Sequence, residues 1–179
     1  PNGCDPLTHQ DIPLLRTVAL LTPPFASLTY AVPDWLAGFA WCPGLRVAVP
    51  LGRGMLRIGV VIGDGSPLPE GVTARPMLWP LEKEPLLPPG HMEMVRQLAL
   101  RQAVTPGQIL AMVLPAGLRV TQMRLRTMEG QGKAQIRLLK DLPKLPVEVL
   151  SALGEAWMRG GAELLGPRED AAASEIGRA

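Results

Sequence analysis

The chain has 179 residues, of which 47% are hydrophobic, and it carries a formal net charge of +2. This length allows one large domain or two small ones, and the apolar content is enough for a buried core, which excludes an intrinsically disordered chain. No apolar run approaches the about 20 residues of a membrane-spanning helix, so we expect a cytoplasmic protein. Cys4, Cys42 and the two histidines lack metal-ligand spacing, which predicts free thiols and no metal site.

The first half of the chain has the pattern of a β-rich domain. Residues 1–12 are polar and turn-rich and are expected to be a disordered arm. Strands are predicted over residues 17–21, 29–32, 45–51, 56–62 and 72–78, where apolar and polar residues alternate between proline- and glycine-rich turns. Trp35, Trp41 and Trp79 are expected to help fill the core. These elements predict a small curled β-sheet or barrel.

The most informative segment is a predicted hairpin over residues 43–63. In its first strand Leu45, Val47, Val49 and Leu51 alternate with other residues, and in its second Leu56, Ile58, Val60 and Ile62 do so, giving each strand one apolar face. The turn between the strands holds Gly52, Arg53 and Gly54. Glycine allows close backbone approach and Arg53 supplies a permanent cation with five donors, so this tip is suited to a phosphate-bearing ligand.

Helical periodicity begins near His91. A helix is predicted to about Ala103, and Thr105 followed by Pro106 marks the start of a second helix that ends near Pro115. Both are expected to pack on the sheet, with Met92, Met94 and Met112 as core residues rather than as a groove for a partner. Residues 119–144 are predicted to be a basic linker containing one or two strands.

The charge is unevenly distributed. Residues 95–144 contain nine basic and two acidic side chains, a local net charge of +7. Such a segment is typical of a surface that binds a polyanion, although a solvated face is the alternative.

The last segment, residues 145–179, has a helical beginning. A helix is predicted from Pro146, with Val149, Leu150, Leu153 and Trp157 on one face, and a further helix over residues 168–176. Two helices around a short apolar segment are how a helix-turn-helix begins.

Motifs of common enzymes are absent. The chain contains no phosphate-binding loop, no Gly-x-Ser-x-Gly and no His-Glu-x-x-His, and Glu82 and Glu84 are expected to be solvated in a turn. We therefore predict no catalytic residues, no cofactor and no enzymatic activity in this chain.

Several segments resemble a known family in their order and spacing. Leu28-Thr29-Tyr30-Ala-Val-Pro, the stretch from Pro43 to Arg53, Arg57-Ile-Gly-Val-Val, Glu84-Pro-Leu-Leu, Thr-Pro-Gly-Gln-Ile-Leu and Val-Leu-Pro follow one another as they do in the N-terminal region of the PriA family. These proteins restart bacterial DNA replication. The likeness is clear over residues 14–118 and weaker over residues 135–179. It implies an α+β fold: a small curled sheet or barrel with two packed helices, followed by a partial winged helix.

The resemblance implies a binding function. Residues 13–118 would be a domain that binds the 3′ end of the nascent strand at forked DNA, in a pocket for one terminal nucleotide. The implied DNA-binding residues are Leu28, Thr29, Tyr30, Pro50, Leu51, Gly52, Arg53, Arg57 and Arg75. The family's helicase lobes lie beyond this segment, and the family often has an aspartate where Thr29 stands. Tyr30 could stack on a base, but a lone strand tyrosine is more often a core residue.

The implied partners are forked or single-stranded DNA with a free 3′ end, a single-stranded-DNA-binding protein and other primosome proteins. The chain itself is expected to be a monomer, because it has no heptad pattern and no long apolar strand edge. Two other functions remain open: a small barrel that binds single-stranded RNA or DNA without recognising an end, and a scaffold that docks a protein partner.

Overall fold

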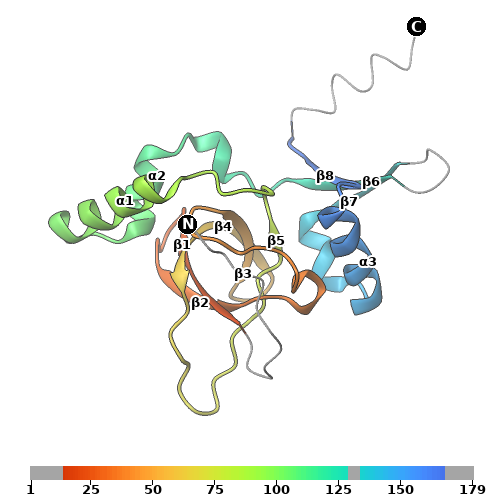
Figure 1. Ribbon diagram of the computed structural model, residues 1–179, viewed down its shortest axis with the longest axis horizontal. Helices are drawn as coiled ribbons and strands as arrows, with labels where there is room; N and C mark the ends of the chain where they lie inside the picture. Colours follow the sequence, from red (N-terminus) through yellow and green to blue (C-terminus); the bar gives the residue numbers. More distant parts are fainter. Residues whose placement is uncertain (1–13, 129–133, 168–179) are drawn as a thin grey trace, which may run out of the picture. The chain divides into compact units, whose positions relative to one another are not determined.

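The computed structural model describes residues 14–128 and 134–167. The chain divides into two compact units, residues 1–120 and residues 121–179. Both units combine helices with an antiparallel sheet, which confirms the expected α+β class (Figure 1). The expected arm over residues 1–12 lies outside the described residues.

A five-stranded sheet forms the centre of unit 1. Its order is β2-β1-β4-β3-β5, and all neighbours are antiparallel. The strands are β1 (Leu15–Leu20), β2 (Ser27–Ala31), β3 (Arg46–Leu51), β4 (Met55–Asp64) and β5 (Trp79–Pro80). The sheet is curled but not closed by strand ladders, since among residues 14–128 the segment before β5 is joined to β2 by a single parallel bridge, between Ala31 and Pro76. The barrel alternative therefore does not hold in its closed form.

The predicted hairpin forms with a register that separates its two apolar faces. Val47 lies opposite Gly59 and Val49 opposite Arg57, whereas Ala48 lies opposite Ile58. Residues directly opposite one another share a face, so the apolar rows of the two strands lie on different faces of the hairpin. Both faces are nevertheless covered, because most of β3 is buried. This strand belongs to the core.

The segment before β5 does not form the predicted strand over residues 72–78. A turn closes at Gly71, whose φ is +80°, and Val72 N–H donates to the Pro69 carbonyl. Pro76 has no N–H to contribute to a ladder. Regular pairing with β3 therefore begins only at Trp79, which is fully buried.

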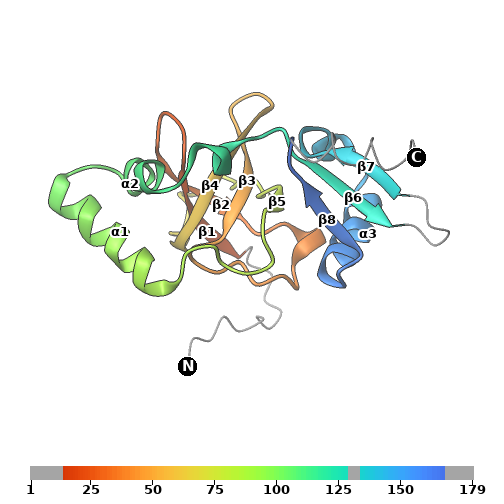
Figure 2. The same cartoon turned by 90° about the horizontal axis from the view of Figure 1, so that it is seen from above.

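Two helices lie on one side of the sheet in both views of the ribbon (Figures 1 and 2). They are α1 (Pro89–Gln102) and α2 (Pro106–Val113), with 3₁₀ turns η1 (Asp34–Leu36) and η2 (Ala116–Arg119) elsewhere in the unit. Thr105 caps α2 as predicted, because its side chain accepts from Gln108 N–H while the Gln108 side chain accepts from Thr105 N–H. The methionine prediction is wrong in part, since Met94 and Met112 are 45% and 78% exposed.

A buried ion pair joins distant parts of unit 1. Arg46 on β3 is 8% exposed and binds the Glu82 carboxylate, and its Nη1 donates to the Leu118 carbonyl at 2.6 Å. Burial raises the pKa of Glu82, and the Arg46 charge opposes this effect. The prediction that Glu82 is solvated is therefore wrong: its side chain is 21% exposed and paired. Sequence alone gave no signal for a pair 36 residues apart.

The expectation of free thiols also fails for Cys42, which is disulfide-bonded. Cys4 lies outside the described residues.

The described residues of unit 2, 121–128 and 134–167, form a three-stranded antiparallel sheet and one α-helix. Its elements are β6 (Arg124–Met128), β7 (Ala134–Leu138), η3 (Leu139–Lys144), α3 (Val147–Met158) and β8 (Ala162–Leu165), and the strand order is β7-β6-β8. The buried residues include Leu125, Leu142, Leu150, Leu153 and Trp157. Within residues 119–144, which were predicted to be a basic linker containing one or two strands, residues 124–128 and 134–138 form strands and residues 139–144 form a 3₁₀ helix.

Helix α3 forms at the position of the helix predicted from Pro146, and strand β8 follows it. The further helix over residues 168–176 lies outside the described residues.

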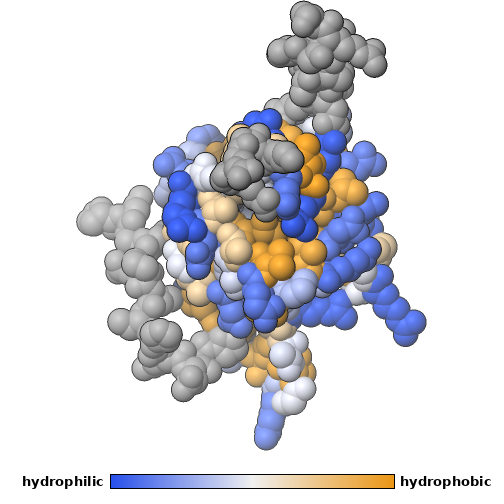
Figure 3. Space-filling model, turned by 90° about the vertical axis from the view of Figure 1, so that its right-hand side faces the viewer, coloured by the Kyte–Doolittle hydropathy of each residue, from blue (hydrophilic) through white to orange (hydrophobic). Residues whose placement is uncertain are grey.

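Met128, Ile136 and Leu138 are exposed in unit 2, and the face drawn in Figure 3 mixes hydrophobic with hydrophilic side chains. Within residues 14–128 and 134–167, no helix is both long and apolar enough to cross a membrane.

Candidate nucleic-acid interface

Side-chain hydrogen bonds join the end of the β3–β4 hairpin to two segments distant in sequence, β2 and the segment before β5. The Tyr30 hydroxyl on β2 donates to the Pro50 carbonyl on β3 at 3.0 Å. The Arg75 guanidinium donates to the Gly52 carbonyl at the hairpin turn. Because the Arg75 carbonyl also accepts from Ala31 N–H, this residue spans from the edge of β2 to the hairpin. The fold thus brings together five of the residues that the resemblance implied: Tyr30, Pro50, Leu51, Gly52 and Arg75.

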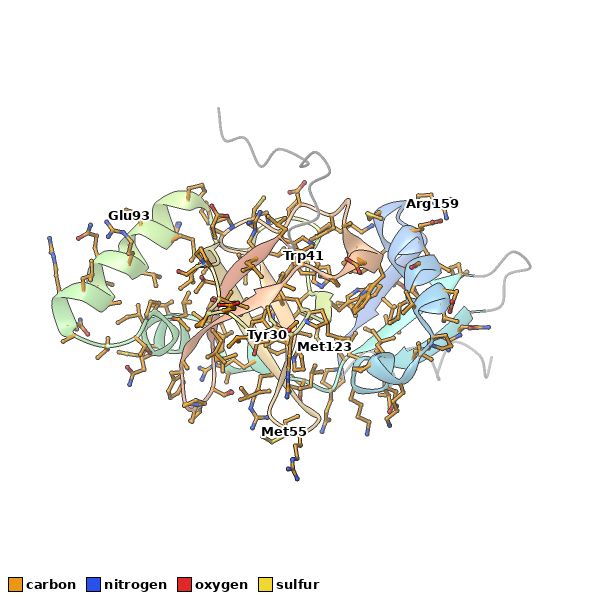
Figure 4. All side chains as sticks on the ribbon, turned by 90° about the horizontal axis from the view of Figure 1, so that it is seen from below. Tyr30, Trp41, Met55, Glu93, Met123 and Arg159 are labelled. Carbon is orange, nitrogen blue, oxygen red and sulfur yellow. The ribbon has the colours of Figure 1, made fainter. Side chains whose placement is uncertain are left out.

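Tyr30 is a core residue. It is 4% exposed, and it lies inside the sheet in Figure 4. Burial raises the pKa of Tyr30, while the nearby Arg75 charge acts in the opposite direction. Its ring is therefore unavailable as an exposed stacking platform. Its role at this site is to hold the β2 edge against the end of β3.

Thr29 presents its main chain, rather than its side chain, to the open edge of β2. Leu20 N–H donates to the Ala26 carbonyl, and Val32 N–H donates to the Leu14 carbonyl. Hydrogen-bonded and non-hydrogen-bonded pairs alternate along an antiparallel ladder, so in this register Thr17 and Thr29 form a non-hydrogen-bonded pair. The Thr29 N–H and C=O consequently point away from β1. Among the described residues no backbone partner is found for them. One donor and one acceptor are thus available at this edge.

The side chains of β2 alternate between the two faces of the sheet. Leu28 and Tyr30 share one face, and Thr29 points to the other. A Cβ placed on Gly65 would lie 2.8 Å from the Thr29 methyl carbon, which shows where this side chain packs. The three residues therefore do not form one wall with their side chains. At Thr29, the groups that face the open edge of β2 are therefore those of the backbone.

The hairpin turn depends on glycine. Leu51 pairs with Met55, and Gly52 and Gly54 between them have φ of +58° and +79°. Side chains disfavour this left-handed region, so the tight turn needs glycine at both positions. Arg53, between them, is exposed, and no hydrogen bond or ion pair of its side chain is found within the described residues. It is available to an anionic ligand.

Arg57 lies on β4 just behind the turn. Its Nη1 donates to the Leu56 carbonyl at 3.3 Å and its Nη2 lies 3.7 Å from the Met55 sulfur, while its Nε is buried with no partner within the described residues. A guanidinium with donors to spare can accept a further anion at this position. Arg53, Arg57 and Arg75 together make the hairpin tip cationic. We call residues 51–57 with Arg75 the basic tip.

The longer basic stretch over residues 95–144 is largely neutralised or engaged by its own neighbours. Arg96 pairs with Glu93, Arg126 with Glu163 and Lys144 with Asp141. Arg119 donates instead to the carbonyls of Ala111 and Leu114 near the end of α2. These contacts favour the solvated-face alternative for this stretch. At the DNA-binding residues that the resemblance implied, the arginines for which no ion pair is found within the described residues are Arg53, Arg57 and Arg75 of the basic tip.

Met55 at the tip and the main chain of Thr29 are features that the sequence did not indicate. An apolar residue directly after a turn was the available signal for Met55. For Thr29 the signal depended on the pairing of β2, which a sequence pattern does not reveal. Within the described residues, no group of His, Cys, Asp or Glu side chains could hold a metal ion.

Comparison with known proteins identifies the family of the chain. No curated protein matches the chain. A family model described as the 3′ DNA-binding domain (3′BD) of PriA matches residues 17–115, which is more than half of the chain and includes every residue of the basic tip. This model describes a DNA-binding domain rather than a catalytic one. The chain therefore belongs to the PriA 3′ DNA-binding domain family.

Proposed function

We propose that unit 1 recognises the free 3′-terminal nucleotide of a DNA strand at a fork, with the nucleotide placed between the edge of β2 and the basic tip. The observation that carries this proposal is that hydrogen bonds from Tyr30 to Pro50 and from Arg75 to Gly52 hold the edge of β2 and the hairpin turn together. It rests also on membership of a family whose domain binds DNA at a 3′ end.

The proposed contacts follow from the available groups. Thr29 offers an N–H donor and a C=O acceptor side by side, and each DNA base carries donors and acceptors on its exposed edges. Main-chain contacts of this kind do not depend on the Thr29 side chain, so a threonine can stand where relatives have aspartate. Arg53 and Arg57 are suited to bind the phosphates nearest the 3′ end of the strand. Such contacts would recognise an end without reading sequence, and they need no cofactor.

The wider setting belongs to the same proposal. Replication restart takes place on chromosomal DNA in the bacterial cytoplasm, so we place the chain there as a monomeric module. A single-stranded-DNA-binding protein and other primosome proteins are its proposed neighbours. Residues 145–179 are proposed to be the beginning of a winged-helix domain, on the basis of α3 and the strand that follows it.

A titration of the full chain with short oligonucleotides tests the proposal. We expect an oligonucleotide with a free 3′ hydroxyl to bind about tenfold more tightly than one blocked by a 3′ phosphate, since the blocked end adds charge and bulk where main-chain groups face the sugar. Fluorescence anisotropy gives both affinities. Equal affinity for the two ends would refute end recognition. Equal affinity for internal and terminal segments would instead favour a general single-strand binder.

Arginine variants test the role of the basic tip. Replacing Arg53 by Ala should weaken binding and reduce the slope of log affinity against log salt by about 0.7, the value for one phosphate contact on a single strand. Arg101→Ala is the matched control, because Arg101 is an exposed arginine in the last turn of α1, outside the tip. An unchanged slope for Arg53→Ala would remove this residue from the site.

A further inference from the structure

An exposed apolar side chain stands at the end of the hairpin. Met55 is 48% exposed and follows the turn directly, opposite Leu51. Figure 4 shows it at the projecting end of the hairpin. A Cβ on Gly52 would lie 3.8 Å from the terminal methyl of Met55, so this methyl reaches the residue whose carbonyl Arg75 binds. Met55 therefore forms the lip of the proposed nucleotide site.

The surroundings of Met55 indicate what it contacts. The Arg57 guanidinium lies 3.7 Å from its sulfur, and Arg53 is exposed within the same turn. Residues 51–57 contain two arginines and no acidic residue, and Arg75 adds a third cation to the basic tip. A polarizable thioether among uncompensated cations matches a ligand with flat apolar faces linked by anionic groups, which is the chemistry of a nucleic-acid strand. An apolar protein surface would leave the arginines without partners.

Placing a terminal nucleotide in the site has an energetic cost that Met55 can offset. In a duplex the 3′ nucleotide is stacked and paired, so it must be extruded before it can reach the Thr29 edge. Extrusion exposes the face of the next base pair to water. Methionine is among the apolar side chains that proteins insert between base steps. A methionine at the lip can cover that face.

We infer, on the basis of the proposed function, that Met55 is a wedge that packs against the base pair next to the extruded 3′-terminal nucleotide. Arg53 and Arg57 hold the phosphates on either side of the opened step. The wedge makes the site competent for a paired 3′ end, whereas a strand that already ends single-stranded needs no opening.

The experiment compares Met55→Ala with Met112→Ala in the full chain. Met112 is a second exposed methionine, 78% accessible on α2, and it receives the same substitution. Each protein is titrated with a duplex that has a paired 3′ end and with an oligonucleotide that has a single-stranded 3′ end. We expect Met55→Ala to lose about fivefold in affinity for the paired end and less than about twofold for the single-stranded end. Met112→Ala should match the unmodified chain on both.

A 2-aminopurine base beside the terminal pair reports the opening directly. Its fluorescence should rise when the unmodified chain binds, rise less with Met55→Ala, and recover with Met55→Leu, which restores an apolar side chain of similar volume. Equal losses on both DNAs, or no loss on either, would refute the wedge. Failure of the proposed function has a different signature, because the unmodified chain would then show no preference for a free 3′ hydroxyl on any DNA.

Discussion

At the scale of single residues, Tyr30 shows how burial changes the role of a side chain that looks available for stacking. Its hydroxyl donates to Pro50, and its ring is packed in the sheet. Tyr30 contributes to the candidate site indirectly, because its hydrogen bond to Pro50 holds the edge of β2 in place. It also gives the folded protein a measurable titration, because Tyr30 is the only tyrosine of the chain.

We expect Tyr30 to ionise above its ordinary pKa of 10.0 in the folded protein, since burial raises this pKa more than Arg75 lowers it. The unfolded chain then loses its proton first, so the folding stability contributed by the neutral hydroxyl is present below pH 10 and falls as pH rises above it. Ultraviolet absorbance of tyrosinate in the folded chain, compared with the same chain in urea, measures the shift. A folded-state titration at or below that of the unfolded chain would contradict it.

At the scale of elements, the packing of α2 on the sheet depends on a glycine. A Cβ on Gly107 would lie 2.4 Å from the Leu20 carbonyl oxygen and 2.8 Å from that of Phe25. These are backbone atoms, so relief requires movement of the helix or of β1. Gly90 follows the first proline of α1 just as Gly107 follows that of α2, but nothing lies within 4 Å of its Cβ position. The two glycines form a matched pair.

We expect Gly107→Ala to lower the free energy of unfolding by about 2 kcal/mol, a typical cost of overpacking against a rigid neighbour. Gly90→Ala should leave stability unchanged or raise it by about 0.5 kcal/mol, because alanine loses less conformational entropy in a helix. Urea unfolding followed by circular dichroism compares them. Similar effects of both substitutions would show that α2 does not approach the sheet this closely.

At the scale of the whole molecule, the candidate site lies entirely in unit 1. The residues concerned run from Leu28 to Arg75, and the contacts that close this unit include Arg46 with the Leu118 carbonyl and Arg119 with Ala111. A chain that ends at Val120 keeps all of these contacts. We therefore expect the folding of unit 1 and the proposed end recognition to be separable from unit 2.

We expect residues 1–120 alone to fold and to keep their preference for a free 3′ hydroxyl over a 3′ phosphate, with affinity within about threefold of the full chain because the phosphate contacts of the basic tip are retained. Anisotropy titrations of both chains measure this. Loss of the preference in a folded fragment would place part of the recognition in unit 2.

The local signals in the sequence predicted the elements well where neighbouring residues decide the structure. Thr105 with Pro106 specified the start of α2, and the glycines around Arg53 specified a hairpin turn. The strand predicted over residues 72–78 failed, because Pro76 and the turn at Gly71 interrupt the pairing that its composition suggested. Residues 119–144 were predicted to be a basic linker with one or two strands; β6 and β7 form there, and Leu125 and Leu142 of this stretch are buried.

By itself, the sequence determined the class of fold, the hairpin with its cationic turn and the motifs by which the family is identified, since each of these depends on residues adjacent in the chain. Only the tertiary structure decided that Tyr30 reaches Pro50 across 20 residues and that Arg75 reaches Gly52 across 23. It also decided that Thr29 turns its main chain to the open edge. The reason is physical: strand register and long-range hydrogen bonds depend on how the whole sheet satisfies its backbone groups and buries its side chains.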